Sequence, residues 1–292
     1  MRIATEMEYF GRRLGWEQAL ELTAKAGFDC MDLSLFSMTT GTEDIFLRPE
    51  GVEYAAKLKE KAAALGISIN QSHAPFRMDM KQWMNGDRED ILWRLCQAIR
   101  VAAAAGCHSI IIHPVQCINY LNHDPMWIKQ VNLEFYGALA PTAKECGIRI
   151  AIENMWQRHR YTKYIVSSVC SSPWEHAAYV DECNAIEPVF TACLDVGHSV
   201  LTGVDPGLAI RVLGDRLGCL HLHDVDGKND CHTCPTTLVV DFPAIVEALR
   251  ETGYKGEFTL EAMCYLDRFP VEEHFDALCK MQKVCCDLLG RE

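Results

Sequence analysis

Short apolar runs alternate with longer amphipathic segments along the whole chain. The segment 16–26 has a helical pattern and ends at Gly27, directly before the apolar run 28–33. Gly66, Gly106, Gly147 and Gly253 stand in the same place between later segments and runs. Glycine there is a common C-cap of an α-helix, so each one marks where a helix ends and a strand is about to begin. The pattern predicts helix–strand units repeated from end to end.

Counted over the chain, this alternation predicts eight strands and eight helices. The expected strands are 3–5, 28–33, 67–70, 109–112, 148–152, 189–194, 219–222 and 258–260. The expected helices are 16–26, 52–65, 91–105, 127–146, 173–182, 206–213, 242–252 and 271–289. Apolar strands joined by helices form parallel sheets, and eight such units favour a closed (β/α)8 barrel, the TIM barrel of the α/β class. No glycine-rich phosphate fingerprint follows the first strand, which argues against an open dinucleotide-binding sheet.

The length of the chain fits one such barrel. It has 292 residues, and neither a linker nor a low-complexity segment interrupts the alternation, so we expect one domain over residues 1–292. Hydrophobic residues make up 49% and charged residues 23%, a balance typical of soluble globular proteins. The sequence has no run of the roughly 18 apolar residues that a membrane span needs. We expect a protein without a membrane partner.

Cysteine usage and the N-terminal residues bear on the compartment. The chain has 15 cysteines, and they are scattered through apolar stretches instead of framing a small loop-rich domain. That distribution is typical of reduced thiols in a protein core. The first residues lack the apolar core and cleavage site of a secretion signal. The sequence therefore predicts a cytoplasmic protein.

The net charge bears on the partner. The formal charge is −12, which opposes non-specific attraction to phosphate backbones. The loops after the second and third expected strands contain few cations, namely Arg48, Arg77 and Lys81, and acidic residues accompany them. A nucleic acid is therefore not the expected partner.

Metal-binding residue types occur at the ends of six consecutive expected strands. The strand-end segments are 71–75, 112–114, 152–154, 194–198, 221–224 and 260–261. They contribute His73, His113, Glu153, Asp195, His198, His221, His223, Asp224 and Glu261. In a parallel barrel, the carboxyl ends of all strands meet at the face where active sites are built. We expect these side chains to converge there.

Such a gathering predicts a cation. Buried carboxylates that point into one cavity repel one another and lose their charge unless something positive lies between them. A divalent ion satisfies this requirement, and ligation by carboxylate and imidazole together suits manganese, zinc, cobalt or magnesium. The sequence therefore predicts a divalent metal ion as the cofactor.

Four strand-end segments resemble the xylose-isomerase-like barrel superfamily of sugar and sugar-phosphate isomerases and epimerases. They are Ile152-Glu153-Asn154, Leu194-Asp195-Val196-Gly197-His198, His221-Leu222-His223-Asp224 and Leu260-Glu261. The resemblance extends over nearly the whole chain. In the ketose 3-epimerase branch, a Glu, an Asp, a His and a Glu hold one metal ion, and the matching residues here are Glu153, Asp195, His221 and Glu261. His221 is preferred to His223 because the family ligand stands three residues before an acidic residue, here Asp224.

The same superfamily contains endonuclease IV, a zinc enzyme that cleaves DNA at abasic sites. Residues of this chain also match its larger ligand set, and they are His73, His113, Glu153, Asp195, His198, His221, Asp230, His232 and Glu261. The resemblance thus implies room for a second metal ion, with His73, His113, His198, Asp230 and His232 as its candidate ligands. Superfamily members that resemble sugar isomerases also have an Asp-x-His after the seventh strand, usually followed by a loop with Gly-x-Gly. This chain has Thr233-Cys234-Pro235 at that point instead.

The resemblance implies an isomerase or epimerase of carbohydrate metabolism that acts on a small keto sugar, a sugar phosphate or a related polyol ketone through an enediolate. Glu153 and Glu261 are then the catalytic pair that removes and returns a proton. His73, His113 and His198 are expected to bind the substrate or the second ion, and aromatic residues such as Phe76, Trp83 and Trp156 to exclude water. The superfamily also implies a homodimer or homotetramer.

Three other interpretations of the sequence remain open. A dehydratase of the inosose or dehydroshikimate type shares the enolate step, so the motifs separate it poorly from an isomerase. An abasic-site endonuclease and a metal-binding barrel without catalytic activity are further alternatives. The lone Cys231-His232-Thr233-Cys234 motif lacks a second cysteine pair and is not expected to form a separate structural zinc site. His108, His123, His159 and His176 lack a strand-end position, so we expect them to be surface or capping residues.

Overall fold

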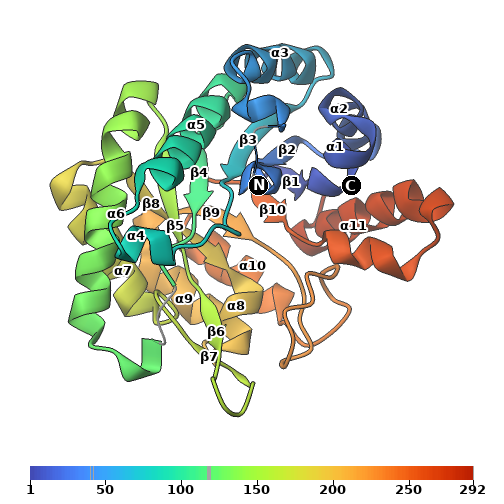
Figure 1. Ribbon diagram of the computed structural model, residues 1–292. Coiled ribbons are helices and arrows are strands. Elements are labelled where there is room, and N and C mark those ends of the chain that lie inside the picture. The colour runs from blue at the N-terminus through green and yellow to red at the C-terminus, as the bar shows by residue number, and fades with distance from the viewer. Residues whose placement is uncertain (40, 42, 117–119, 292) are drawn as a thin grey trace.

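The computed structural model describes residues 1–39, 41, 43–116 and 120–291. Eight parallel strands form one sheet in the order β10-β1-β2-β3-β4-β5-β8-β9. They are β1 (Ile3–Glu6), β2 (Cys30–Ser34), β3 (Ser68–His73), β4 (Ser109–Ile112), β5 (Arg149–Glu153), β8 (Phe190–Asp195), β9 (Leu217–His221) and β10 (Phe258–Leu260). Figure 1 shows these strands at the centre of the molecule, surrounded by helices.

The sheet curls into a barrel whose two edges meet. Beyond the end of β9, Leu222 forms a parallel bridge with Leu260 of β10. The Leu222 amide donates to the Thr259 carbonyl at 2.9 Å, and the Glu261 amide donates to the Leu222 carbonyl at 3.1 Å. The predicted (β/α)8 barrel is confirmed.

Helices follow the strands and pack around the barrel. They are α1 (Glu8–Leu14), α2 (Trp16–Lys25), α3 (Gly51–Ala64), α4 (Lys81–Met84), α5 (Glu89–Ala105), α6 (Pro125–Cys146), α7 (Pro173–Ile186), α8 (Val196–Leu201), α9 (Pro206–Leu213), α10 (Phe242–Glu251) and α11 (His274–Leu289). Each of the eight expected helices has a counterpart, with ends that differ by a few residues. No helix in the described part of the chain is long and apolar enough to cross a membrane.

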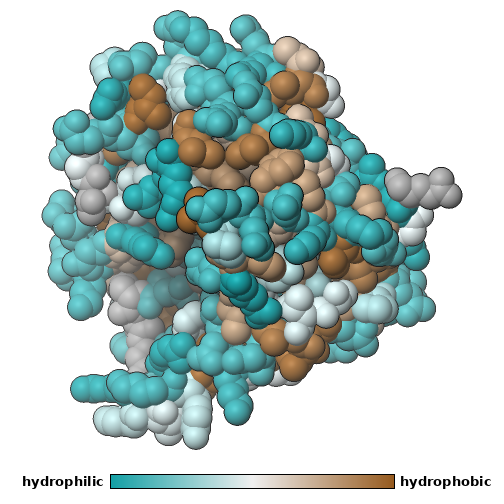
Figure 2. All heavy atoms as spheres, turned by 90° about the vertical axis from the view of Figure 1, so that its right-hand side faces the viewer, coloured by the Kyte–Doolittle hydropathy of each residue, from teal (hydrophilic) through white to brown (hydrophobic). Residues whose placement is uncertain are grey.

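Several short elements were not predicted. Helices α1, α4 and α8 are too short for a periodic apolar pattern to reveal them. The strands β6 (Trp156–Arg158) and β7 (Ile165–Ser167) form an antiparallel hairpin after β5. In Figure 1 this hairpin projects from the lower edge of the molecule. Figure 2 shows the face that lies on the right-hand side of Figure 1. Polar side chains, interspersed with apolar ones, cover it, which is ordinary for a folded domain.

The apolar core has two parts. The larger part lies between the strands and the helices, and the smaller part consists of Ile111, Ala151, Cys193 and Cys219 from four adjacent strands. Side chains two residues apart on a strand point to the same side. The residues two positions further along these strands are His113, Glu153, Asp195 and His221. The smaller apolar layer therefore lies directly beneath four of the predicted site residues.

Candidate metal centre at the barrel mouth

The first group of side chains joins the ends of four strands. Ligand atoms of Glu153, Asp195, His221 and Glu261 all lie within 4.8 Å of one another. Nδ1 of His221 is 3.0 Å from Oε1 of Glu153 and 3.2 Å from Oε2 of Glu261. These are the four residues that the resemblance gave as the ligands of one metal ion, and the fold brings them together.

A second group shares Glu153 with the first. Nε2 of His113 lies 2.9 Å and Nε2 of His73 lies 3.4 Å from Oε2 of Glu153. The two Nε2 atoms are 3.1 Å apart. Glu153 thus directs one carboxylate oxygen to each group, and it is 1% exposed.

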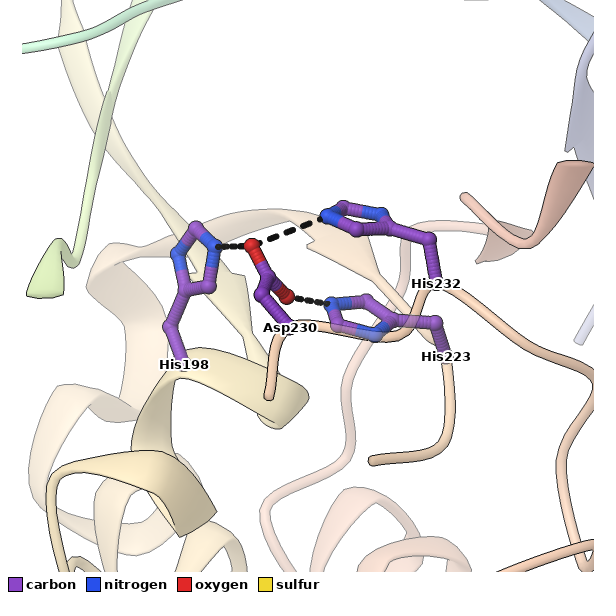
Figure 3. A group of neighbouring side chains, drawn as sticks. All are labelled: His198, His223, Asp230 and His232. Carbon is purple, nitrogen blue, oxygen red and sulfur yellow. Dashed lines mark ion pairs between the residues drawn. The ribbon is translucent and has the colours of Figure 1, made fainter. Parts of the chain in front are cut away.

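A third group adjoins the other two and is drawn in Figure 3. Oδ2 of Asp230 lies 3.4 Å from Nε2 of His198 and 3.2 Å from Nε2 of His232. Nε2 of His223 lies 3.8 Å from Oδ1 of Asp230. The His223 and His232 rings are stacked, with centroids 4.0 Å apart. In Figure 3 the three imidazole rings converge on the Asp230 carboxylate from helix α8, from the end of β9 and from the loop that follows it.

Backbone carbonyls orient three of these histidines. Nδ1 of His73 is 2.6 Å from the Ala74 carbonyl, Nδ1 of His198 is 2.9 Å from the Asn154 carbonyl, and Nδ1 of His232 is 3.0 Å from the Glu261 carbonyl. A carbonyl only accepts, so in each neutral ring Nδ1 donates and Nε2 keeps its lone pair. The Nε2 atoms are the ones that face the carboxylates. This is the arrangement by which proteins fix the tautomer of metal-binding histidines.

The groups also have the spacing of ligands around an ion. Bonds of 2.0–2.2 Å to a tetrahedral ion place the ligand atoms about 3.3–3.6 Å from one another. The separations of 2.9–3.8 Å around Glu153, His221 and Asp230 bracket that range. Oε2 of Glu153 and Oδ1 of Asp230 are buried, yet neither has a well-directed hydrogen bond in the described part of the chain. The residues present therefore fit a divalent metal ion.

In the metal-free protein, protonated histidines balance the negative charge of the carboxylates. Burial by itself would raise the pKa of Glu153, but His221 and His113 outweigh it and hold that pKa well below its usual value. Burial would lower the pKa of His198, but Asp195 and Asp230 raise it to about 10. The pKa of His232 is raised too, because Glu261 and Asp230 outweigh its burial. The site thus holds enough negative charge to keep imidazoles protonated, and a bound cation would displace those protons.

A cavity of about 390 Å³ gives access to the three groups. Its lining includes His73, His113, Glu153, His198 and Glu261. This volume falls within the usual range for small-molecule sites. Phe76 and Trp156 line its wall as expected. Trp83 does not, because it is 1% exposed and packs against Phe135 in the core.

Three buried polar residues at this end of the barrel were left out of the ligand sets expected from the sequence. His223 was set aside in favour of His221, yet both lie at the site, and Nε2 of His223 is 3.0 Å from both oxygens of Asp195. Glu6, the last residue of β1, is 4% exposed, and Asp32, which lies opposite it within β2, is 1% exposed. The signal was present, since Glu6 follows the expected strand 3–5, Asp32 is a carboxylate within the expected strand 28–33, and His223 continues the alternation of His221.

Two further expectations concern residues outside the groups. Cys231 and Cys234 are free thiols, and the metal-binding groups found among the described residues contain no cysteine. The expectation that His176 is a surface or capping residue is wrong. It is 0% exposed, and Nε2 of its ring donates to the Ile152 carbonyl at 2.8 Å.

Comparison with known proteins gives a family match. The model of the family described as "Xylose isomerase-like TIM barrel" matches residues 20–281. An uncharacterized protein of Methanocaldococcus jannaschii, MJ1311, is 23% identical over 247 residues, which cover 83% of this chain and 78% of that protein. An inosose dehydratase of Lacticaseibacillus casei is 33% identical over 85 residues, which cover 23% of this chain and 28% of the dehydratase.

Solved structures with the same fold include sugar epimerases. A D-psicose 3-epimerase crystallised in the presence of D-fructose has a TM-score of 0.74 at 16% identity, over 99% of this chain and 100% of that one. An L-ribulose 3-epimerase has a TM-score of 0.74 at 18% identity, over 99% of this chain and 94% of that one. The 3-keto-D-glucoside 4-epimerase of E. coli has a TM-score of 0.73 at 16% identity, over 97% of this chain and 99% of that one. At these identities the likeness shows a shared fold.

Proposed function

The chain belongs to the xylose isomerase-like TIM barrel family, and we propose that it is a divalent-metal-dependent isomerase or epimerase of a small keto sugar, a sugar phosphate or a related polyol ketone. The observation that carries the proposal is the convergence of Glu153, Asp195, His221 and Glu261, whose ligand atoms lie within 4.8 Å of one another. The epimerases that share the fold support the same class of reaction.

These four residues would hold a manganese, zinc, cobalt or magnesium ion. The ion supplies Lewis-acid stabilisation of the negative charge that develops on substrate oxygens when the neighbouring C–H bond loses its proton. Nδ1 of His221, which lies 3.0 Å from Oε1 of Glu153 and 3.2 Å from Oε2 of Glu261, would be its ligand atom. Glu153 and Asp195 are 1% and 0% exposed, so bulk water has little access to their carboxylates.

The protein contributes the acid and the base. Glu153 and Glu261 both line the cavity, so a substrate carbon held between them lies within reach of two carboxyl groups. One carboxylate accepts the proton from carbon, and the other carboxyl group returns a proton, either to the opposite face of the same carbon or to its neighbour. His73 and His113 also line the cavity and can bind the substrate hydroxyl groups, and His198 can do so where it holds no second ion.

We propose a second ion at the third group of side chains. His198, Asp230 and His232 supply one ligand atom each, and His223 adds a fourth that the resemblance did not include. His73 and His113 lie with Glu153 instead, so they serve the substrate or a further ion beside the first.

A dehydratase is the second candidate function. The local match to an inosose dehydratase, 33% identity over 85 residues, favours it. The same residues would remove the proton, but a hydroxyl group would then leave from the adjacent carbon. The product distinguishes the two reactions, because a dehydratase gives an unsaturated or deoxygenated ketone and an epimerase gives an isomer.

Solvent exchange tests the proposal. The protein is loaded with each of the four metals and incubated in D2O with a panel of ketoses, ketose phosphates and inososes, and NMR follows both deuterium incorporation and products. We expect metal-dependent exchange at one carbon, lost at least 100-fold in Glu153→Gln and Glu261→Gln. Glu257→Gln is the control, because Glu257 lies before β10 at the opposite end of the barrel and pairs with His108. Exchange unchanged in both site variants would refute the acid–base pair, and efficient incision of an abasic-site duplex would overturn the function.

A further inference from the structure

A second cavity adjoins the first. Its volume is about 270 Å³, and it shares the lining residues Phe76, Arg77, His232 and Glu261 with the 390 Å³ cavity. Glu261 therefore borders both spaces. A substrate that contacts Glu261 from the first cavity can extend a substituent into the second.

The charged side chains that line this second cavity are mainly acidic. Its carboxyl groups come from Glu6, Glu8, Glu261 and Asp267, and Arg77 is the one arginine or lysine among the described residues that line it. Neighbouring carboxylates in a partly enclosed space create a negative potential that attracts cations and repels anions. Glu261 and His232 belong to the proposed metal groups, so the carboxyl groups of Glu6, Glu8 and Asp267 are the ones that favour a positively charged substituent over a phosphate or a carboxylate.

Glu6 is the buried member of this lining. It ends strand β1 and is 4% exposed. Its Oε1 accepts a hydrogen bond from the Glu8 amide, whereas Oε2 has no hydrogen-bond or ion-pair partner among the described residues. Burial raises the pKa of Glu6 well above its usual value, and the carboxylates of Asp32 and Glu261 raise it further. A buried carboxylate without a counter-ion is costly, and a ligand cation beside Oε2 would remove that cost.

Aromatic rings form part of the same wall. Phe36 and Phe76 both line the cavity and pack edge to face, with centroids 5.2 Å apart. Aromatic faces attract ammonium groups through the ring quadrupole, and this attraction is largest where water is excluded. Carboxylates together with aromatic rings make up a lining suited to an organic cation.

We propose that the second cavity binds an ammonium group of the substrate and that Glu6 is the carboxylate that pairs with it. This inference rests on the proposed function, and it narrows the substrate class to amino-substituted keto sugars or polyol ketones. The reacting end of such a substrate lies between Glu153 and Glu261, and the amine lies beyond Glu261.

Binding of unreactive polyols tests the inference without turnover. The probes are 1-amino-1-deoxy-D-glucitol, D-glucitol and D-glucitol 6-phosphate, titrated calorimetrically into the metal-loaded full chain at pH 7. We expect the aminated hexitol, which is protonated at this pH, to bind at least tenfold more tightly than D-glucitol. In Glu6→Gln, which keeps an acceptor for the Glu8 amide, we expect that ratio to fall to about one. Glu53→Gln on the exposed face of α3 is the matched control and should keep the ratio.

Each other outcome argues against the inference. Equal affinity for the aminated and neutral hexitols would overturn it, and so would tightest binding of the phosphate, which would assign the cavity to Arg77. A preference that survives in Glu6→Gln would show that Glu6 is not the partner. A melting curve of Glu6→Gln guards against misfolding, and we expect no loss of stability because the substitution removes a buried acidic group. Solvent exchange on neutral ketoses is independent of these titrations, so the function and the inference can fail separately.

Discussion

The ring of His223 occupies the space that a side chain at position 197 would need. A β-carbon on Gly197 would overlap Cε1, Nε2 and Nδ1 of His223. The ring is held there because its Nε2 lies 3.0 Å from both oxygens of Asp195. Gly197 lies in α8, where its backbone is helical. The glycine in Asp195-Val196-Gly197-His198 is therefore required by the close approach of His223 and not by a backbone conformation reserved for glycine.

Gly197→Ala should disturb the site through His223. The new methyl group forces the ring away from Asp195, so we expect the second metal ion, of which His223 is a proposed ligand, to bind at least tenfold more weakly. We also expect the stability to fall by about 1–3 kcal/mol, the usual cost of overpacking. Metal titration and thermal unfolding measure the two effects. Gly137→Ala in α6 is the control, because a β-carbon there has no neighbour within 4 Å. It should leave metal binding unchanged and stabilise the helix by about 0.5–1 kcal/mol. Equal behaviour of the two variants would contradict the packing argument.

The fold was predictable because each strand and helix repeats the same local signals. Glycine caps such as Gly66 and Gly106 separate helices from apolar runs, and eight repeats leave few topologies. The short helix α8 was not predictable in this way, since six residues are too few for a periodic pattern. It forms because the Asp195 side chain accepts a hydrogen bond from the His198 amide at 2.7 Å and so caps the helix.

The candidate site was predictable in part. Strand-end position and family motifs identified nine residues that the fold brings into three adjoining groups, but the motifs left His223 out of the ligand sets and neither signal identified Glu6. The motif names His221 as the ligand and so passes over the residue two positions later, although the strand alternation points it to the same side. The role of Glu6 depends on the second cavity, whose walls come from strand ends and loops distant in the sequence. Such a cavity is a property of the assembled barrel.

Glu153→Gln should weaken metal binding more than any other single change. Glu153 contacts His221 through Oε1 and His113 through Oε2. The first and the second group of side chains at the barrel mouth therefore both lose a charged ligand atom. We expect affinity to fall by about two orders of magnitude or more, since even residues that only orient ligands are worth about 10–100-fold. Elemental analysis after dialysis against known free metal gives the occupancy. Full occupancy of Glu153→Gln at the wild-type midpoint would show that the carboxylate is not a ligand.

Asp230→Asn should remove the second ion and leave the first. Asp230 contacts His198 and His232 but belongs to a group that does not include Glu153 or His221. We expect the number of bound ions per chain to fall by one, while the affinity of the remaining ion changes less than threefold. Asp226→Asn is the control, because Asp226 lies in the same loop and binds only loop groups in the described structure. A wild-type protein that binds only one ion under saturating metal would reject the second centre.

His176 should make the protein sensitive to mild acid. The ring is buried between α7, to which His176 belongs, and β5, where Nε2 donates to the Ile152 carbonyl. Nδ1 has no partner among the described residues, so a proton on Nδ1 would place an unsolvated charge there. Burial accordingly lowers the pKa of His176 from 6.5 to about 4. In the unfolded chain the imidazole takes up a proton near pH 6.5, but in the folded chain it does not until the pH approaches 4. Its contribution to stability is therefore complete above pH 6.5 and is lost as the pH falls toward 4.

The difference between wild type and His176→Gln isolates this effect. Glutamine keeps an N–H donor for the Ile152 carbonyl but does not titrate, so the difference cancels the acid sensitivity of the carboxylates and metal-binding histidines. We expect the wild type to lose about 2 kcal/mol more than the variant between pH 7.5 and 5, because one differential proton is worth about 1.4 kcal/mol per pH unit. Denaturant unfolding of the metal-free proteins at several pH values measures it. Parallel stability curves would mean that His176 takes up its proton equally in both states, and the buried neutral ring would then be excluded.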